Sequence, residues 1–141
     1  MGMDLCAIDC SAPEDSLASD GFHANWTWWG VLTDMLDRLD ADLTGVSGSN
    51  DGDIVEKDVA LSWAALLEQN LDSLYLLEVN MPEDKFRTLH FFIAPGHGYD
   101  LLEMAKVPNS KIHMLKDIED TYTYVKEFIE FCRYCGGFAQ Y

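Results

Sequence analysis

Basic residues are scarce in this sequence. Nine Lys and Arg stand against 25 Asp and Glu among 141 residues, which gives a net charge of −16. Nucleic acids and anionic lipid surfaces are bound through basic surfaces, so the composition argues against both as partners. The sequence also has no run of 18 apolar residues, so it predicts no membrane-spanning helix.

The amino-terminal region lacks the features of a secretory signal. Its first twenty residues contain five acids and no base, and they include no long apolar run. We therefore expect a cytoplasmic protein. In that compartment its four cysteines would stay reduced.

Signatures of catalysis are missing as well. The sequence has no glycine-rich phosphate loop, no H-E-x-x-H pair and no complete nucleophile elbow. An enzyme would need a cleft with titratable groups, and His90 and His97 are the residues that could supply one. Because no nucleophile, base and orienting group can be assembled, we predict no catalytic residues and no cofactor, and an enzyme is the least favoured function.

What the sequence does contain is apolar periodicity within a length typical of one domain. Apolar residues recur every three to four positions over 25–42, 56–77 and 113–135, which predicts three long amphipathic helices. Asn25 is the expected N-cap of the first helix. Gly136 and Gly137 are expected to end the last one.

The other segments carry weaker signals. Residues 1–22 are predicted to form a loose amino-terminal arm, and residues 23–141 a single helical domain. Residues 84–94 fit either a helix or a buried strand, and we favour the helix. The predicted fold is mainly α: a compact bundle of the three long helices plus a smaller helix or strand element. At most a minimal β segment, near Val55, is expected.

Two cysteine pairs invite a metal interpretation. Cys132-x-x-Cys135 and Cys6-x-x-x-Cys10 have spacings that zinc sites use. However, Cys132 and Cys135 fall at the carboxy-terminal end of a predicted helix, where backbone carbonyls disfavour a thiolate. We therefore expect packing rather than a metal, and a zinc-binding module stays an alternative. A small-ligand module built on the Gly96–Gly98 loop is a further alternative.

The acids are concentrated in the first part of the chain. Residues 1–56 hold twelve acids and one base, Arg38. Such a surface attracts basic proteins and speeds their encounter. We therefore predict a protein-interaction module, similar to small immunity proteins or inhibitors, that binds a basic partner. Its predicted partner-binding residues are Asp34, Asp37, Asp40, Asp42, Asp51 and Asp53.

Three tryptophans lie almost consecutively at Trp26, Trp28 and Trp29. They cannot all face one core from a single helix, so at least one is expected at a surface or an interface. The alternative is that all three are buried beneath the amino-terminal arm.

Three segments together resemble a group of small bacterial hypothetical proteins without an established function. They are the Trp-rich first helix, the block "SNDGDIVEKDVALSWAALLE" and the ending "FIEFCRYCGGF". The resemblance implies an Asn-Asp-Gly turn, a short extended segment, an Ala/Leu-rich helix and a carboxy-terminal helix closed by Gly-Gly-Phe; it implies no activity. Glu56 departs from the group's pattern, which has Ser or Thr as the helix cap there. The matching positions are Asn50, Asp51, Gly52, Val55, Ala60, Ala64, Leu67, Phe128, Ile129, Phe131, Cys132, Gly136, Gly137 and Phe138.

Overall fold

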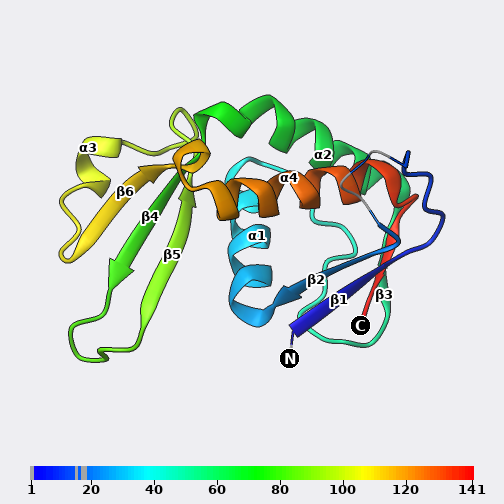
Figure 1. The fold of residues 1–141 in the computed structure, drawn as a ribbon, viewed down its shortest axis with the longest axis horizontal. Helices are drawn as coiled ribbons and strands as arrows, with labels where there is room; N and C mark the ends of the chain where they lie inside the picture. Colours follow the sequence, from blue (N-terminus) through cyan, green and yellow to red (C-terminus); the bar gives the residue numbers. More distant parts are fainter. Residues whose placement is uncertain (1, 15, 17–18) are drawn as a thin grey trace.

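Two antiparallel sheets accompany three long helices in this protein (Figure 1). The computed structural model describes residues 2–14, 16 and 19–141. The fold is therefore mixed α/β, and the prediction of a mainly or entirely α-helical bundle is wrong. The sheets lie toward opposite ends of the molecule, with one helix between them and two helices running side by side above it.

The three predicted helices are all present, although each is shorter than predicted. They are α1 (Trp26–Arg38), α2 (Lys57–Asn70) and α4 (Glu119–Tyr134). Asn25 caps α1 as expected, because its side-chain oxygen accepts a hydrogen bond of 2.8 Å from the Trp28 amide. Gly136 follows α4 with a φ of 66°, a conformation that favours glycine and ends the helix.

The first sheet joins the two ends of the chain. Its strands are β1 (Gly2–Ala7), β2 (Gly21–Asn25), β3 (Asp53–Val55) and β7 (Phe138–Gln140), in the order β2-β1-β7-β3. The segment predicted as a loose arm thus contains a paired strand, in which Met3 and Leu5 are fully buried. These two side chains lie two positions apart and so face the same side of β1. The minimal extended segment expected near Val55 is confirmed as β3.

Gln140 is the buried polar residue of this sheet. Its side-chain nitrogen donates to the carbonyl oxygens of Gly45 and Asp53, at 2.8 and 2.9 Å. Its side-chain oxygen accepts from the Ser47 amide at 2.9 Å. One side chain on β7 therefore fixes the loop that leads into β3.

The second sheet contains β4 (Tyr75–Asn80), β5 (Thr88–Ile93) and β6 (Ser110–Met114), with β4 in the centre. The helix favoured for residues 84–94 is therefore wrong, and the strand alternative holds. The predicted second helix also ran too far, because α2 gives way to the short 3-10 helix η1 (Leu71–Ser73) before β4. The last helix was likewise predicted to begin too early. Residues 113 and 114 belong to β6, and the short 3-10 helix η2 (Leu115–Asp117) precedes α4.

A short helix, α3 (Leu101–Met104), follows β5, and Asp100 caps it through a 2.9 Å bond from the Leu102 amide. It lies beside the second sheet (Figure 1). Within the described residues, no helix has the length and apolar character needed to cross a membrane.

Candidate functional site

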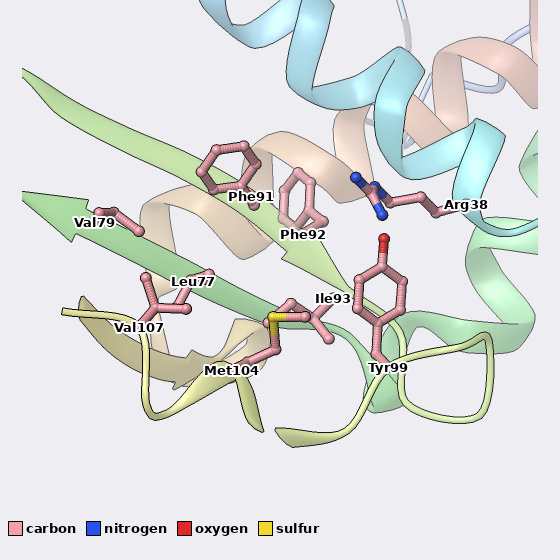
Figure 2. A pocket seen from close by; sticks show the side chains of 9 residues that line it. All are labelled: Arg38, Leu77, Val79, Phe91, Phe92, Ile93, Tyr99, Met104 and Val107. Carbon is pink, nitrogen blue, oxygen red and sulfur yellow. The ribbon is translucent and has the colours of Figure 1, made fainter. Parts of the chain in front are cut away.

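A cavity of about 330 Å³ lies on the second sheet, beneath the segment that carries α3. Two neighbouring strands supply its floor, and the α3 segment and the end of α1 supply its walls (Figure 2). Its lining is almost entirely apolar, with one cation and one hydroxyl. The residues are Arg38, Leu77, Val79, Phe91, Phe92, Ile93, Tyr99, Met104 and Val107.

The alternation of side chains along the strands explains the apolar floor. Leu77 and Val79 on β4 pair with Phe91 and Leu89 on β5, and all four side chains project on the same side of the sheet. Phe91 remains 39% exposed although it lies in the middle of β5. This side of the sheet is therefore apolar without being fully covered by the protein.

Among the described lining residues, Arg38 is the one cation. It is the last residue of α1, and its Nε donates to the Asp34 carboxylate one turn earlier at 2.8 Å. Its guanidinium carbon lies 5.1 Å from the centre of the Tyr99 ring, within the range of a cation–π contact. The ion pair and the aromatic ring together hold the guanidinium at the edge of the cavity.

Tyr99 contributes an unsatisfied hydroxyl. This oxygen is buried, and it has no hydrogen-bond partner within the part of the chain that the structure describes. Figure 2 shows the hydroxyl end of the ring directed at the Arg38 guanidinium. A buried hydroxyl without a partner costs about 1–3 kcal/mol, which a bound acceptor would recover. The cavity can therefore take an apolar molecule whose acceptor group lies between Tyr99 and Arg38.

The sequence pointed to part of this site only. The Gly96–Gly98 loop, considered as a ligand loop, leads directly into Tyr99. In the sequence, Arg38 stands out only as the single base among residues 1–56, and this isolation among acids is the signal that points to it. The apolar floor was missed because β4 and β5 were not predicted as strands.

The six acids predicted to bind a partner are spread over three segments. Asp34 and Asp37 lie on α1, Asp40, Asp42 and Asp51 lie in the connection to β3, and Asp53 begins β3. Asp34 is engaged by Arg38. Asp42 accepts from the Thr44 hydroxyl at 2.5 Å and from its amide, and these bonds lower the pKa of Asp42. Their role in partner binding stays a prediction.

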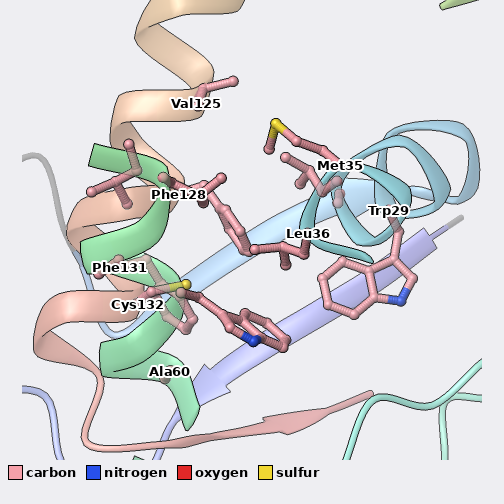
Figure 3. Packing of buried hydrophobic residues seen from close by; sticks show 14 of the residues in the cluster. Trp29, Met35, Leu36, Ala60, Val125, Phe128, Phe131 and Cys132 are labelled. Carbon is pink, nitrogen blue, oxygen red and sulfur yellow. The ribbon is translucent and has the colours of Figure 1, made fainter. Parts of the chain in front are cut away.

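The four cysteines divide into two environments. Cys6 and Cys10 are exposed, whereas Cys132 and Cys135 are buried at the end of α4. Figure 3 shows Cys132 among the buried hydrophobic side chains. Burial raises the pKa of Cys132 well above its usual value and that of Cys135 to about 11, so both stay protonated at neutral pH. A protonated thiol is a poor nucleophile.

The amino-terminal segment does run beside these buried thiols, since the Asp9 amide donates to the Cys135 carbonyl at 2.9 Å. In the described residues, however, no three His, Cys, Asp or Glu side chains are grouped so that they could hold a metal ion. The arrangement therefore gives the zinc alternative no geometric support.

The two histidines considered for catalysis have different surroundings. His90 lies on β5, and its ring stacks on Trp28 at a centroid distance of 5.9 Å. His97 lies in the turn after β5, where its amide donates to the Ala94 carbonyl. Neither has an acid or nucleophile partner among the hydrogen bonds of the described residues.

Comparison of the chain with protein-family models, curated proteins and solved structures gives no match. The geometry of the apolar cavity is therefore the basis for a functional proposal.

Proposed function

We propose that the protein binds a small apolar molecule that carries a carboxylate. The observation that supports this function best is the buried, unpartnered Tyr99 hydroxyl next to Arg38 at the edge of an apolar cavity. Ligand sites usually combine an apolar lining with a few polar groups that fix orientation, in volumes of roughly 300–1,000 Å³. At about 330 Å³ the cavity suits a small ligand.

The carboxylate follows from the two polar groups. An arginine guanidinium binds carboxylates through a planar set of donors, and the tyrosine hydroxyl adds one donor more. Because the chain has a net charge of −16, an anion needs a local cation to be held here, and Arg38 supplies it. The apolar walls would hold the hydrocarbon part of the ligand.

The test uses the full chain and two probes of similar length, octanoate and octanol. We expect octanoate to perturb the amide NMR signals of Val79, Ile93 and Tyr99 in a saturable way. Tyr99→Phe keeps the ring and removes only the hydroxyl. It should lower the affinity for octanoate about tenfold, because hydrogen bonds to charged groups contribute roughly 1.5–3 kcal/mol. Arg38→Gln should lower the affinity for octanoate at least as much. Either substitution should change the affinity for octanol far less.

Tyr122→Phe is the matched control, since Tyr122 packs against Lys126 on α4 and does not line the cavity. The proposal fails if octanoate leaves the three signals unmoved. It fails equally if the affinity is the same in the wild type, Tyr99→Phe and Arg38→Gln.

A further inference from the structure

A second, smaller hollow lies on the opposite side of the second sheet, where the start of α1 meets the start of α4. It has a volume of about 220 Å³ and is lined by Trp28, Asp120, Thr121 and Tyr124. We call it the aromatic notch. Its volume is below that of ordinary small-molecule sites, so it suits a single side chain better than a whole ligand.

The two rings of the aromatic notch are held in place from behind. Trp28 stacks on His90 and contacts Phe92, at centroid distances of 5.9 and 6.1 Å. Tyr124 packs on Phe22 at 5.1 Å, and its hydroxyl donates to the His23 carbonyl at 3.3 Å. Binding at these rings would therefore cost little further ordering of side chains.

The charge around the aromatic notch is negative. Asp120 lines it from the first turn of α4 and is exposed, and Glu127 lies close enough to Tyr124 to affect its titration. Burial and that carboxylate raise the pKa of Tyr124 to about 12, so the hydroxyl remains a donor. No Lys or Arg belongs to the described lining of the notch, and Lys126 lies over Tyr122 instead.

Aromatic faces next to a carboxylate are the surroundings that an organic cation favours. The ring quadrupole attracts the charge, and the apolar ring surface accepts the methylene groups of a Lys or Arg side chain. Trp and Tyr are also enriched among the residues that dominate the binding energy of protein interfaces. The net charge of −16 would speed the approach of a basic protein toward this face.

We propose that the aromatic notch receives a Lys or Arg side chain from a basic protein partner. This assigns partner binding to Trp28, Tyr124 and Asp120 and does not depend on the apolar cavity. The acids that the sequence singled out, such as Asp37 and Asp40, then contribute long-range attraction, whereas the notch provides the specific contact.

The test titrates the full chain, labelled with nitrogen-15, with a hexa-arginine peptide at low salt. We expect saturable movement of the Trp28 indole N–H signal, which is assigned by its loss in Trp28→Phe. A hexa-citrulline peptide has nearly the same shape without the charge and should not move this signal. Spermine serves as the free polyamine and should bind more weakly without producing the same shift.

Asp120→Asn should lower the affinity for the hexa-arginine peptide about threefold or more. This is the effect expected from one exposed charge pair that supports the cation–π contacts of the bound side chain. Asp117→Asn is the matched control: it removes an exposed charge from η2, just before α4, and should have a much smaller effect. The proposal is overturned if both variants weaken binding equally or if the Trp28 signal does not respond. Equal responses to hexa-citrulline exclude cation recognition, and equal binding of spermine excludes a protein as the occupant.

Discussion

At the scale of a single residue, Gln140 holds parts of the chain together that are far apart in sequence. Three backbone groups, at Gly45, Ser47 and Asp53, have their hydrogen bonds satisfied by its amide. The side chain itself is fully buried. Buried polar groups of this kind stabilise a structure only while every partner is present.

We expect Gln140→Ala to lower the free energy of unfolding by about 2–4 kcal/mol, because it removes a fully buried side chain together with its three hydrogen bonds to the backbone. Chemical denaturation of both proteins measures the difference. Gln69→Ala, at an exposed position on α2, is the control and should change stability by less than about 0.5 kcal/mol. A loss below about 1 kcal/mol in Gln140→Ala would show that water replaces the amide without difficulty.

The sequence could not reveal the polar pair of the cavity at this scale. Arg38 stood out as an isolated base, but its neighbour Tyr99 lies 61 positions away, and their contact depends on how α1 packs beside β5. The environment of the buried thiols could be predicted more readily. The position of Cys132 and Cys135 at a helix end follows from local periodicity and from Gly136 and Gly137. Partial exposure of the tryptophans was also expected, and Trp26 is 41% exposed.

At the scale of secondary-structure elements, α1 and α2 begin in different ways. Asn25 caps α1 with its side chain, whereas Glu56 occupies the same position before α2 and makes no capping bond. The backbone of Glu56 is already extended, at φ −67° and ψ 156°, as an N-cap requires. The first-turn amides of α2 therefore lack the side-chain hydrogen bond that α1 receives from its N-cap.

Replacing Glu56 by Ser should raise the free energy of unfolding by about 0.5–1 kcal/mol, because Ser can accept a hydrogen bond from an unpaired amide in the first turn. Asn25→Ala should lower it by about 1 kcal/mol for the converse reason. Thermal or chemical denaturation compares the three proteins. If Glu56→Ser proved no more stable than the wild type, the carboxylate would already satisfy this end of the helix in solution.

Periodicity predicted the long helices because each makes its own backbone hydrogen bonds and shows its buried face within one segment. The strands were harder to predict from the sequence than the helices. Leu71, Leu74 and Tyr75 fit a helical spacing, yet β4 is held as the central strand by pairing with both β5 and β6. Likewise, β7 is only three residues long and pairs with β1 from the opposite end of the chain. Such non-local pairing leaves no signal in a short window of sequence.

At the scale of the whole molecule, the excess of acids has an energetic consequence. The ion pairs of the described residues are few and are exposed or half-buried at the surface; they include Arg38 with Asp34, Lys106 with Glu103, and Arg133 with Glu68 and Glu130. Exposed pairs contribute only about 0–1 kcal/mol each. We therefore expect repulsion among the remaining carboxylates to outweigh these pairs and to oppose the compact state.

Raising sodium chloride from about 0.02 to about 0.5 M should accordingly increase stability, since the Debye length falls from roughly 20 to roughly 4 Å. The midpoint of urea unfolding measures this. Asp37→Lys, at an exposed position of α1, makes the net charge two units less negative. The urea midpoint of this variant should rise less with salt than that of the wild type. A midpoint that fell with salt would mean that attraction between specific ion pairs dominates instead.

The place of β7 between β1 and β3 also makes closure of the first sheet depend on a strand that is distant from both in the sequence. Without its three residues, Phe138–Gln140, β1 and β3 have no common neighbour. The helices can form from contacts within one segment, whereas the pairing of β1 with β7 must close a loop that contains most of the sequence. We therefore expect this sheet to close late in folding, and Met3 and Leu5 to become buried only when it does.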